Sequence, residues 1–274
     1  MILITGATGN VGREVVRRLK NEGVLFETAS HRKGQGDRYL NFEDVSSISG
    51  ALEGVDSIFL MRPPQLADAN KYFRPFIEEA IKQKVNHIVF LSVLGADKNK
   101  IVPHAKIEKL IIESNIPYTF LRPSFFMQNL LTQHGEELRK KHDIYVPAGK
   151  GKTSFIDVRD IGVAAMKTLL NKQHIWKAYD LTGIEALSYQ EAAEIFSNKT
   201  GETFTYSNPS IYEFWKTYRK KGISTDKIVV MIGIYTTAKI GLAKRVTSDL
   251  REILGCAPIS FAQFVQDSMS LLKN

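Results

Sequence analysis

Short apolar runs alternate with amphipathic stretches over the first 180 residues of the chain. Apolar residues at helical spacing predict amphipathic helices after Asn10, after Asn70 and from Pro103. The apolar runs themselves predict strands buried on both faces, as in a parallel sheet, over residues 2–7, 25–30, 56–61, 87–93 and 118–124. Because strands that alternate with helices imply right-handed crossovers, we expect an α/β fold with a Rossmann-like, doubly wound parallel sheet.

The pattern changes after Gly183. The stretches 188–201, 210–222, 224–241 and 258–272 predict helices, and residues 203–206 predict one strand. We therefore expect a dinucleotide-binding sheet domain over 1–183, to which C-terminal strands can return, and a smaller, mainly helical lobe over 184–274. No linker rich in proline, glycine and serine separates the two, so the lobe is expected to pack tightly on the sheet domain.

Composition narrows the class of protein. No run approaches the roughly 18 to 20 apolar residues that cross a bilayer, and Met1 leads directly into a strand, so neither a membrane span nor a signal peptide is expected. Cys256 is the only cysteine, which excludes an intrachain disulfide and a C-x-x-C metal site. We predict a cytoplasmic protein without a bound metal.

The chain carries a formal net charge of +8, which favours anionic partners without identifying them. The densest basic patch, residues 216–222, ends a predicted helix, where positive charge complements the helix dipole. Neither zinc-ligand spacing nor a basic recognition helix is present, so nucleic acid is not an expected partner.

Three glycines follow the first predicted strand with the spacing G-x-x-G-x-x-G. Gly6 suits a sharp turn at positive φ, Gly9 lets backbone approach a pyrophosphate, and Gly12 lets the next helix pack closely on the sheet. The N-terminus of that helix presents free N–H groups to phosphates, and we expect Thr8, Asn10 and Val11 to line the same loop. The alternative is a glycine-lined turn that binds nothing.

The loop TGATGNVG resembles that of atypical and extended short-chain dehydrogenases. The stretches YTFLRPSFFMQN (118–129), SVLGADKN (92–99) and SFIDVRDIG (154–162) resemble NmrA-like proteins, a group that includes NAD(P)H:quinone oxidoreductases, triphenylmethane reductases and festuclavine dehydrogenases. The resemblance spans most of the chain. It implies NAD(P)-dependent chemistry without specifying a substrate.

The end of the second strand indicates which dinucleotide is bound. An NAD site usually has an acidic residue there, whereas this chain has Arg32 and Lys33. A guanidinium pairs with a 2′-phosphate, and Arg32 matches the arginine that the resemblance implies. Glu27 is poorly placed to bind ribose. We therefore predict NADP(H) in preference to NAD(H); the alternatives are NAD(H), or loop charges that only face solvent.

Ligands of open parallel sheets bind beyond the carboxyl ends of the strands. The resemblance implies cofactor contacts after three strands and substrate contacts in the stretch after residue 123. An aromatic wall there would suit a flat, quinone-like or other small aromatic substrate, although two phenylalanines also suit a core. The candidates are Met61, Arg62, Pro63, Ser92, Val93, Ser124 and Phe125 for the cofactor, and Phe125, Phe126 and Asn129 for the substrate.

The stretch PHAKIEKL, residues 103–110, contains candidate catalytic residues. Lys106 matches the lysine of the short-chain dehydrogenase motif Y-x-x-x-K, which binds the nicotinamide ribose, but Val102 stands where the motif has tyrosine. Lys106, Ser92 and His104 are candidate catalytic residues; Lys106 and His104 also suit a solvent-facing helix. Without the tyrosine, alcohol–ketone chemistry is not expected, whereas quinones, triarylmethane cations and iminium ions accept hydride without a prior proton.

Two functions from different classes fit these features. The first is an NADPH-dependent oxidoreductase that passes hydride to an electrophilic planar acceptor such as a quinone. The second is an NmrA-type redox sensor that binds NAD(P) without turnover and regulates a protein partner. A sugar-nucleotide epimerase fits the glycine loop but needs the missing tyrosine. The sequence leaves open the natural acceptor, the oligomeric state and the residue, if any, that donates a proton.

Overall fold

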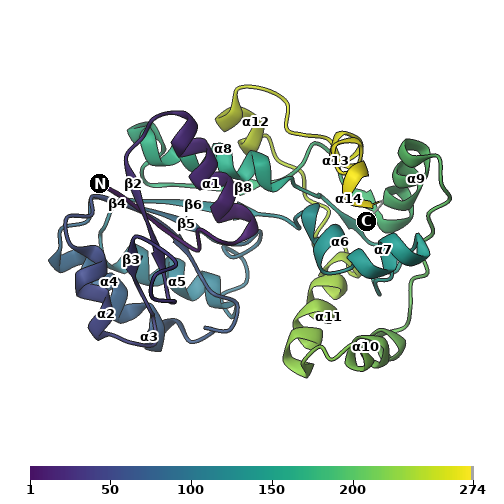
Figure 1. Ribbon diagram of the computed structural model, residues 1–274, viewed down its shortest axis with the longest axis horizontal. Coiled ribbons are helices and arrows are strands. Elements are labelled where there is room, and N and C mark those ends of the chain that lie inside the picture. Colours follow the sequence, from purple (N-terminus) through teal and green to yellow (C-terminus); the bar gives the residue numbers. More distant parts are fainter. Residues whose placement is uncertain (273–274) are drawn as a thin grey trace. The chain divides into compact units, whose positions relative to one another are not determined.

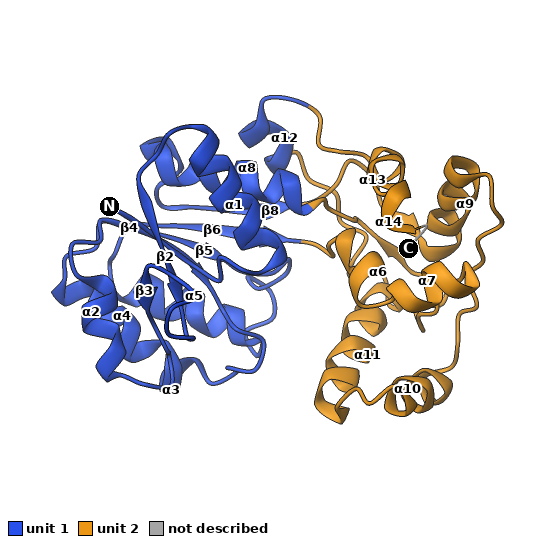
Figure 2. Cartoon of the chain, in the orientation of Figure 1, with its two compact units in different colours: residues 1–123, 158–181, 249–256 blue, residues 124–157, 182–248, 257–274 orange. Residues whose placement is uncertain are grey.

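The computed structural model describes residues 1–272 and divides them into two compact units (Figure 2). Unit 1 comprises residues 1–123, 158–181 and 249–256, and unit 2 comprises the rest. Within the described residues, no helix combines the length and apolar character needed to cross a membrane. The same residues contain no group of three or more His, Cys, Asp or Glu side chains that could hold a metal ion.

Unit 1 is built on a seven-stranded sheet in which each pair of neighbours is parallel (Figure 1). The predicted doubly wound, Rossmann-like sheet is therefore confirmed. The first strand lies in the middle of the order, so the chain winds outward in both directions. That order is β3 (Arg38–Tyr39), β2 (Phe26–Ser30), β1 (Ile2–Thr5), β4 (Ser57–Met61), β5 (His87–Leu91), β6 (Tyr118–Pro123) and β8 (Lys177–Leu181).

Helices cover both faces of this sheet. Alternate strand residues such as Leu3, Ile58 and Phe90 pack in one core with α2 (Ser46–Leu52), α4 (Arg74–Lys82) and α5 (Pro103–Glu113). On the opposite face α1 (Asn10–Asn21) packs against α8 (Val158–Leu170). Gly162 permits this close approach, because a Cβ there would lie 2.6 Å from the Glu14 side chain. The short α3 (Ala69–Tyr72) and a 3₁₀ turn (Lys172–His174) complete the connections.

Unit 2 has its own core, formed by apolar side chains from three separate stretches of the chain. Its helices are α6 (Gln128–Thr132), α7 (Gly135–Lys141), α9 (Tyr189–Thr200), α10 (Ile211–Lys220), α11 (Thr225–Lys239), α13 (Phe261–Asp267) and α14 (Met269–Leu272). A two-stranded antiparallel ribbon pairs β7 (Lys152–Thr153) with β9 (Leu187–Ser188). Ser188 and Ser210 begin α9 and α10 with reciprocal capping boxes.

Two details of unit 2 differ from the sequence prediction. Residues 203–206 form a single bridge between Asp143 and Thr205 instead of a strand. The helix predicted over 258–272 is divided into α13 and α14 at Ser268, whose backbone N–H bonds to Phe264 and Val265 carbonyls.

The units also divide the chain differently from the predicted boundary at residue 183. Residues 124–157 belong to unit 2 because their apolar side chains, such as Leu130 and Phe155, join the second core. In the other direction α12 (Asp249–Leu254) belongs to unit 1. It is tied there by Lys167, whose Nζ donates to the carbonyls of Ile253 (3.1 Å) and Leu254 (2.7 Å) at the helix end. A helix, not a strand, returns to the sheet.

Candidate functional site

The glycine loop between β1 and α1 has the close backbone packing that its spacing predicts. Gly6 has φ of +65°, and its carbonyl accepts a hydrogen bond from the Gly9 N–H at 3.0 Å. A Cβ on Gly12 would lie 2.1 Å from the same carbonyl oxygen. Gly6 therefore supplies the left-handed turn, and Gly12 allows α1 to begin directly against it.

The N-terminus of α1 is left without a side-chain cap. Gly9 is the N-cap residue, and the first turn contains no acidic side chain. The first N–H groups of an α-helix lack intrahelical acceptors, and the helix dipole adds partial positive charge there. Thr8 is exposed at this end, Asn10 is half-buried, and Val11 is buried on the sheet side. This end of α1 suits a phosphate anion.

The end of β2 carries a basic group. Arg32 and Lys33 are exposed, and the Arg32 N–H donates to the Ser30 hydroxyl at 3.1 Å. Within residues 1–272 the Arg32 guanidinium has no hydrogen-bond or ion-pair partner, whereas Lys33 Nζ lies 5.4 Å from the Tyr39 ring centroid. A free guanidinium at this position can pair with a phosphate.

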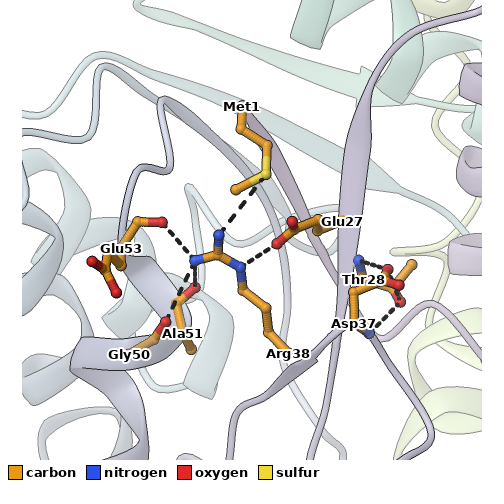
Figure 3. Close-up of polar contacts among 8 residues, drawn as sticks. All are labelled: Met1, Glu27, Thr28, Asp37, Arg38, Gly50, Ala51 and Glu53. Carbon is orange, nitrogen blue, oxygen red and sulfur yellow. Dashed lines mark hydrogen bonds and ion pairs between the residues drawn. The ribbon is translucent and has the colours of Figure 1, made fainter.

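The acidic side chains near β2 are already engaged, as Figure 3 shows. Glu27 pairs with Arg38, which also donates to the carbonyls of Ala51 (3.1 Å) and Glu53 (2.6 Å). The Asp37 carboxylate accepts from the Thr28 N–H at 2.7 Å and from its hydroxyl at 2.8 Å, and these bonds lower the pKa of Asp37. Neither carboxylate is a free ribose ligand.

The carboxyl ends of β1 and β4 are joined by one side chain. Thr5 Oγ1 donates to the Phe59 carbonyl at 3.0 Å and accepts from the Met61 N–H at 2.8 Å. Met61 thereby lies against the glycine loop, since a Cβ on Gly6 would be 3.0 Å from its sulfur.

The turn after β4 is organised by Arg62. Its Nη1 donates to the carbonyls of Pro63 (3.0 Å), Pro64 (2.8 Å) and Leu66 (3.2 Å), and its Nε contacts His104 Nε2 at 3.5 Å. Burial lowers the pKa of Arg62, and burial together with Arg62 lowers the pKa of His104 to about 3. His104 is therefore uncharged near neutral pH, which argues against it as an imidazolium proton donor.

Ser92 is tied into a buried ionic network after β5. Its hydroxyl donates to Glu108 Oε1 at 2.5 Å, and Arg122 binds the same carboxylate with two hydrogen bonds of 2.9 and 2.6 Å. Asp180 Oδ1 lies 3.9 Å from Arg122. Ser92 and Glu108 are about one-twentieth exposed. The hydroxyl proton of Ser92 is thus committed to a carboxylate, which weighs against Ser92 as a proton donor.

Lys106 lies in the first turns of α5, two residues before Glu108. Its side chain is exposed, and Val102 is the N-cap residue with extended backbone. Because the Glu108–Arg122 pair anchors α5 to β6, Lys106 projects from a fixed helix. Val93 is half-buried in the loop before α5.

The remaining predicted residues lie in unit 2, immediately after β6. Ser124 donates to the Ser154 carbonyl, and Phe126 forms a parallel bridge with Ile156. Phe125 is half-buried, with its ring 5.8 Å from that of Phe155 and 6.0 Å from that of Tyr235. Asn129 is half-buried near the start of α6.

The predicted residues that follow β1, β2, β4 and β5 thus all lie at the carboxyl ends of the parallel strands of unit 1. Arg122 was not among the residues predicted for the site, and Glu108 had no predicted role. A signal existed, since Arg122 interrupts an apolar strand and Glu108 lies among apolar residues of a helix. Buried charges of this kind need partners.

Comparison with known proteins places the chain among reductases and related proteins. A model of the NmrA-like family matches residues 37–252. Several relatives match nearly the whole chain, among them the following three. Prestalk A differentiation protein A of Dictyostelium discoideum is 30% identical over 98% of this chain and 92% of its own length. The uncharacterized oxidoreductase YesF of Bacillus subtilis is 33% identical over 96% and 93%, and the NAD(P)H azoreductase of Xenophilus azovorans is 30% identical over 97% of each.

Solved structures show the same fold over the full chain. Triphenylmethane reductase from Citrobacter sp., complexed with NADP(H), superposes with a TM-score of 0.88 at 21% identity and covers 98% of this chain and 100% of its own. An NADPH-dependent quinone oxidoreductase from Escherichia coli, complexed with NADPH, gives a TM-score of 0.87 at 24% identity with the same coverage.

Proposed function

The chain belongs to the NmrA-like family, and we propose that it is an NADPH-dependent oxidoreductase that transfers hydride to an electrophilic, planar acceptor such as a quinone. The broader class, an NAD(P)H-dependent oxidoreductase, agrees with the names of its relatives, an oxidoreductase and an NAD(P)H azoreductase. The preference for NADPH and the class of acceptor are the proposed part.

The glycine loop is the observation that carries the proposal. The contact between Gly12 and the Gly6 carbonyl, together with the uncapped N-terminus of α1, fits a pyrophosphate. Arg32 would hold a 2′-phosphate, because its guanidinium is exposed and Glu27 and Asp37 are engaged elsewhere. When bound, the dinucleotide supplies the hydride from its nicotinamide ring.

Lys106 would hold the nicotinamide ribose, since α5 is fixed by the Glu108–Arg122 pair. The chemical contribution of the protein is then to orient a bound acceptor, a proximity effect. For acceptor binding we propose the half-buried Phe125, whose ring packs on the buried rings of Phe155 and Tyr235, with Phe126 and Asn129 beside it in the chain.

The local chemistry supports an acceptor that needs no enzymatic acid. Val102 replaces tyrosine, the Ser92 proton is bound to Glu108, and His104 is uncharged near neutral pH. A quinone takes hydride directly and can receive its proton from water afterwards.

The test is anaerobic mixing of the purified protein with NADPH and a panel of acceptors, followed at the nicotinamide absorbance band. The panel holds a benzoquinone, a naphthoquinone, a triarylmethane dye and a cyclic iminium ion. We expect saturable oxidation with at least one acceptor and its loss in Gly9→Val. Saturable oxidation that persists in Gly9→Val would instead remove the glycine loop from the site.

A redox sensor of the NmrA type is the second candidate. Val102, Ser92 and His104 supply no acid, and a sensor needs none. One relative is also named for differentiation instead of catalysis. Tight NADPH binding without turnover of any panel member would support the sensor and contradict the reductase.

A further inference from the structure

A buried histidine joins three helical regions of unit 2. His134 lies between α6 and α7, and its side chain is about one-hundredth exposed. Its Nδ1 is 2.5 Å from the hydroxyl of Tyr218 on α10, and its Nε2 hydrogen-bonds the hydroxyl of Tyr235 on α11. Both tyrosines are buried as well.

Burial sets the protonation states of His134, Tyr218 and Tyr235. Burial, with Lys221 nearby, lowers the pKa of His134 to about 3, and burial raises the pKa of Tyr218 and of Tyr235. A neutral imidazole has one donor and one acceptor nitrogen, and each hydroxyl can act in either role. Each of the three groups therefore has a hydrogen-bond partner without any charge.

Tyr235 is one of the few side chains that anchor α11. The buried residues of this helix are Ile228, Tyr235 and Ala238, whereas Val229 and Val230 are more than half exposed. The Tyr235 ring also contacts Phe125, with centroids 6.0 Å apart and the planes inclined at 53°. The His134 hydrogen bond thus acts on a ring that supports Phe125.

We propose that His134 is a positioning residue for acceptor binding. By holding the Tyr235 hydroxyl, it fixes the orientation of the Tyr235 ring and, through ring contact, that of Phe125. The effect on acceptor binding rests on the proposed function, whereas the effect on the Phe125 ring does not.

The chain offers a matched pair of variants. Tyr235→Phe and Tyr218→Phe each remove one hydroxyl from the same imidazole, but the ring contacts of Phe125 are with Phe155 and Tyr235. Loss of one neutral hydrogen bond at the support of Phe125 should raise the acceptor KM about fivefold in Tyr235→Phe, with kcat and NADPH affinity unchanged. Tyr218→Phe should leave the acceptor KM at the wild-type value. Equal KM changes in the two variants would reduce His134 to a purely structural role.

A second readout is independent of turnover. With 4-fluorophenylalanine incorporated at position 125, the ¹⁹F resonance should shift or broaden in Tyr235→Phe and stay unchanged in Tyr218→Phe. An unchanged resonance in Tyr235→Phe would overturn the inference. If the wild-type protein reduces none of the acceptors, the proposed function fails, while the ¹⁹F spectra still decide whether the Tyr235 hydroxyl, which His134 holds, positions Phe125.

Discussion

Replacing Gly12 by alanine tests how closely α1 begins against the glycine loop. The added Cβ would lie 2.1 Å from the Gly6 oxygen, 2.7 Å from the Gly6 carbonyl carbon and 2.9 Å from the Ala7 Cα. All three atoms are backbone, so no side-chain rotation relieves the overlap. Either the helix N-terminus or the Gly6–Ala7 peptide has to move by about 1 Å to restore ordinary contact.

The expected cost follows from this displacement. Forcing an extra methyl into a tightly packed site typically costs about 1–3 kcal/mol, so we expect Gly12→Ala to lower the free energy of unfolding of unit 1 by about 2 kcal/mol. Because the helix end that faces the phosphates moves, NADPH affinity should also fall by about tenfold or more. Urea unfolding followed by circular dichroism and titration of NADPH fluorescence measure the two effects.

Two other glycines serve as controls. A Cβ added to Gly50 on α2 would meet no neighbouring atom within 4 Å, so Gly50→Ala should stabilise the protein by about 0.4–1 kcal/mol and leave NADPH binding unchanged. A Cβ on Gly9 would meet only the Gly6 oxygen, at 3.3 Å, so Gly9→Ala should fold with a small local adjustment. A Gly12→Ala protein as stable as wild type, with full NADPH affinity, would refute the packing argument.

Charged and titratable side chains are expected to affect both cofactor binding and stability. Arg32→Glu should weaken NADPH binding by about tenfold or more and NADH binding much less, measured by parallel titrations; equal weakening would exclude a 2′-phosphate contact. Glu108→Gln leaves the half-buried Arg122 without its bidentate partner and should lower the free energy of unfolding by about 3 kcal/mol in urea, and a change below about 1 kcal/mol would contradict that role. His87, His104 and His134 have pKa values lowered by burial to about 4, about 3 and about 3, below the ordinary 6.5. Unfolding then takes up protons, so stability should be complete above pH 6.5 and fall between pH 6.5 and 4 by about 1.4 kcal/mol per pH unit for each histidine; equal urea midpoints at pH 7 and pH 5 would contradict this.

The strands that the sequence predicts are the five inner strands of the sheet, β1, β2, β4, β5 and β6. All except β2 are mostly buried, because an inner strand with helices on both faces of the sheet demands apolar residues. In β2 only Ala29 is buried and the other residues are half-buried. The missed strands β3 and β8 are the two edges of the sheet. In β8, Lys177 and Ala178 are exposed, so the apolar run that marks an inner strand is absent.

The boundary between the units was harder to predict, because helical periodicity does not say which core a helix joins. Leu130, Leu131 and Leu138 show that a segment is amphipathic, but only the folded chain shows them packing with α9 and α13 in unit 2. The same applies to α12, whose anchorage depends on Lys167 more than 80 residues away in the sequence.

In the candidate site too, local features could be predicted from the sequence and long-range contacts could not. The glycine loop is readable from the sequence because its residues are consecutive and its constraint is local. The tyrosine partners of His134 lie 84 and 101 residues away, and each residue alone looks like an ordinary core residue. A network of this kind has no characteristic spacing along the sequence by which it could be predicted.

The side chains of unit 1 that could donate a proton bear on which acceptor is reduced. Reducing a ketone leaves an alkoxide, a strong base that needs an acid at the reacting oxygen in the transition state. The three candidate positions for such an acid hold a valine at 102, the Ser92 hydroxyl bound to Glu108, and His104, which is neutral beside Arg62. Reducing a quinone leaves a phenolate-type anion, which is a far weaker base and which water can protonate after hydride transfer. We therefore expect these residues to favour quinone reduction over ketone reduction, and comparing a ketone with a quinone of similar size at the same NADPH concentration tests this expectation.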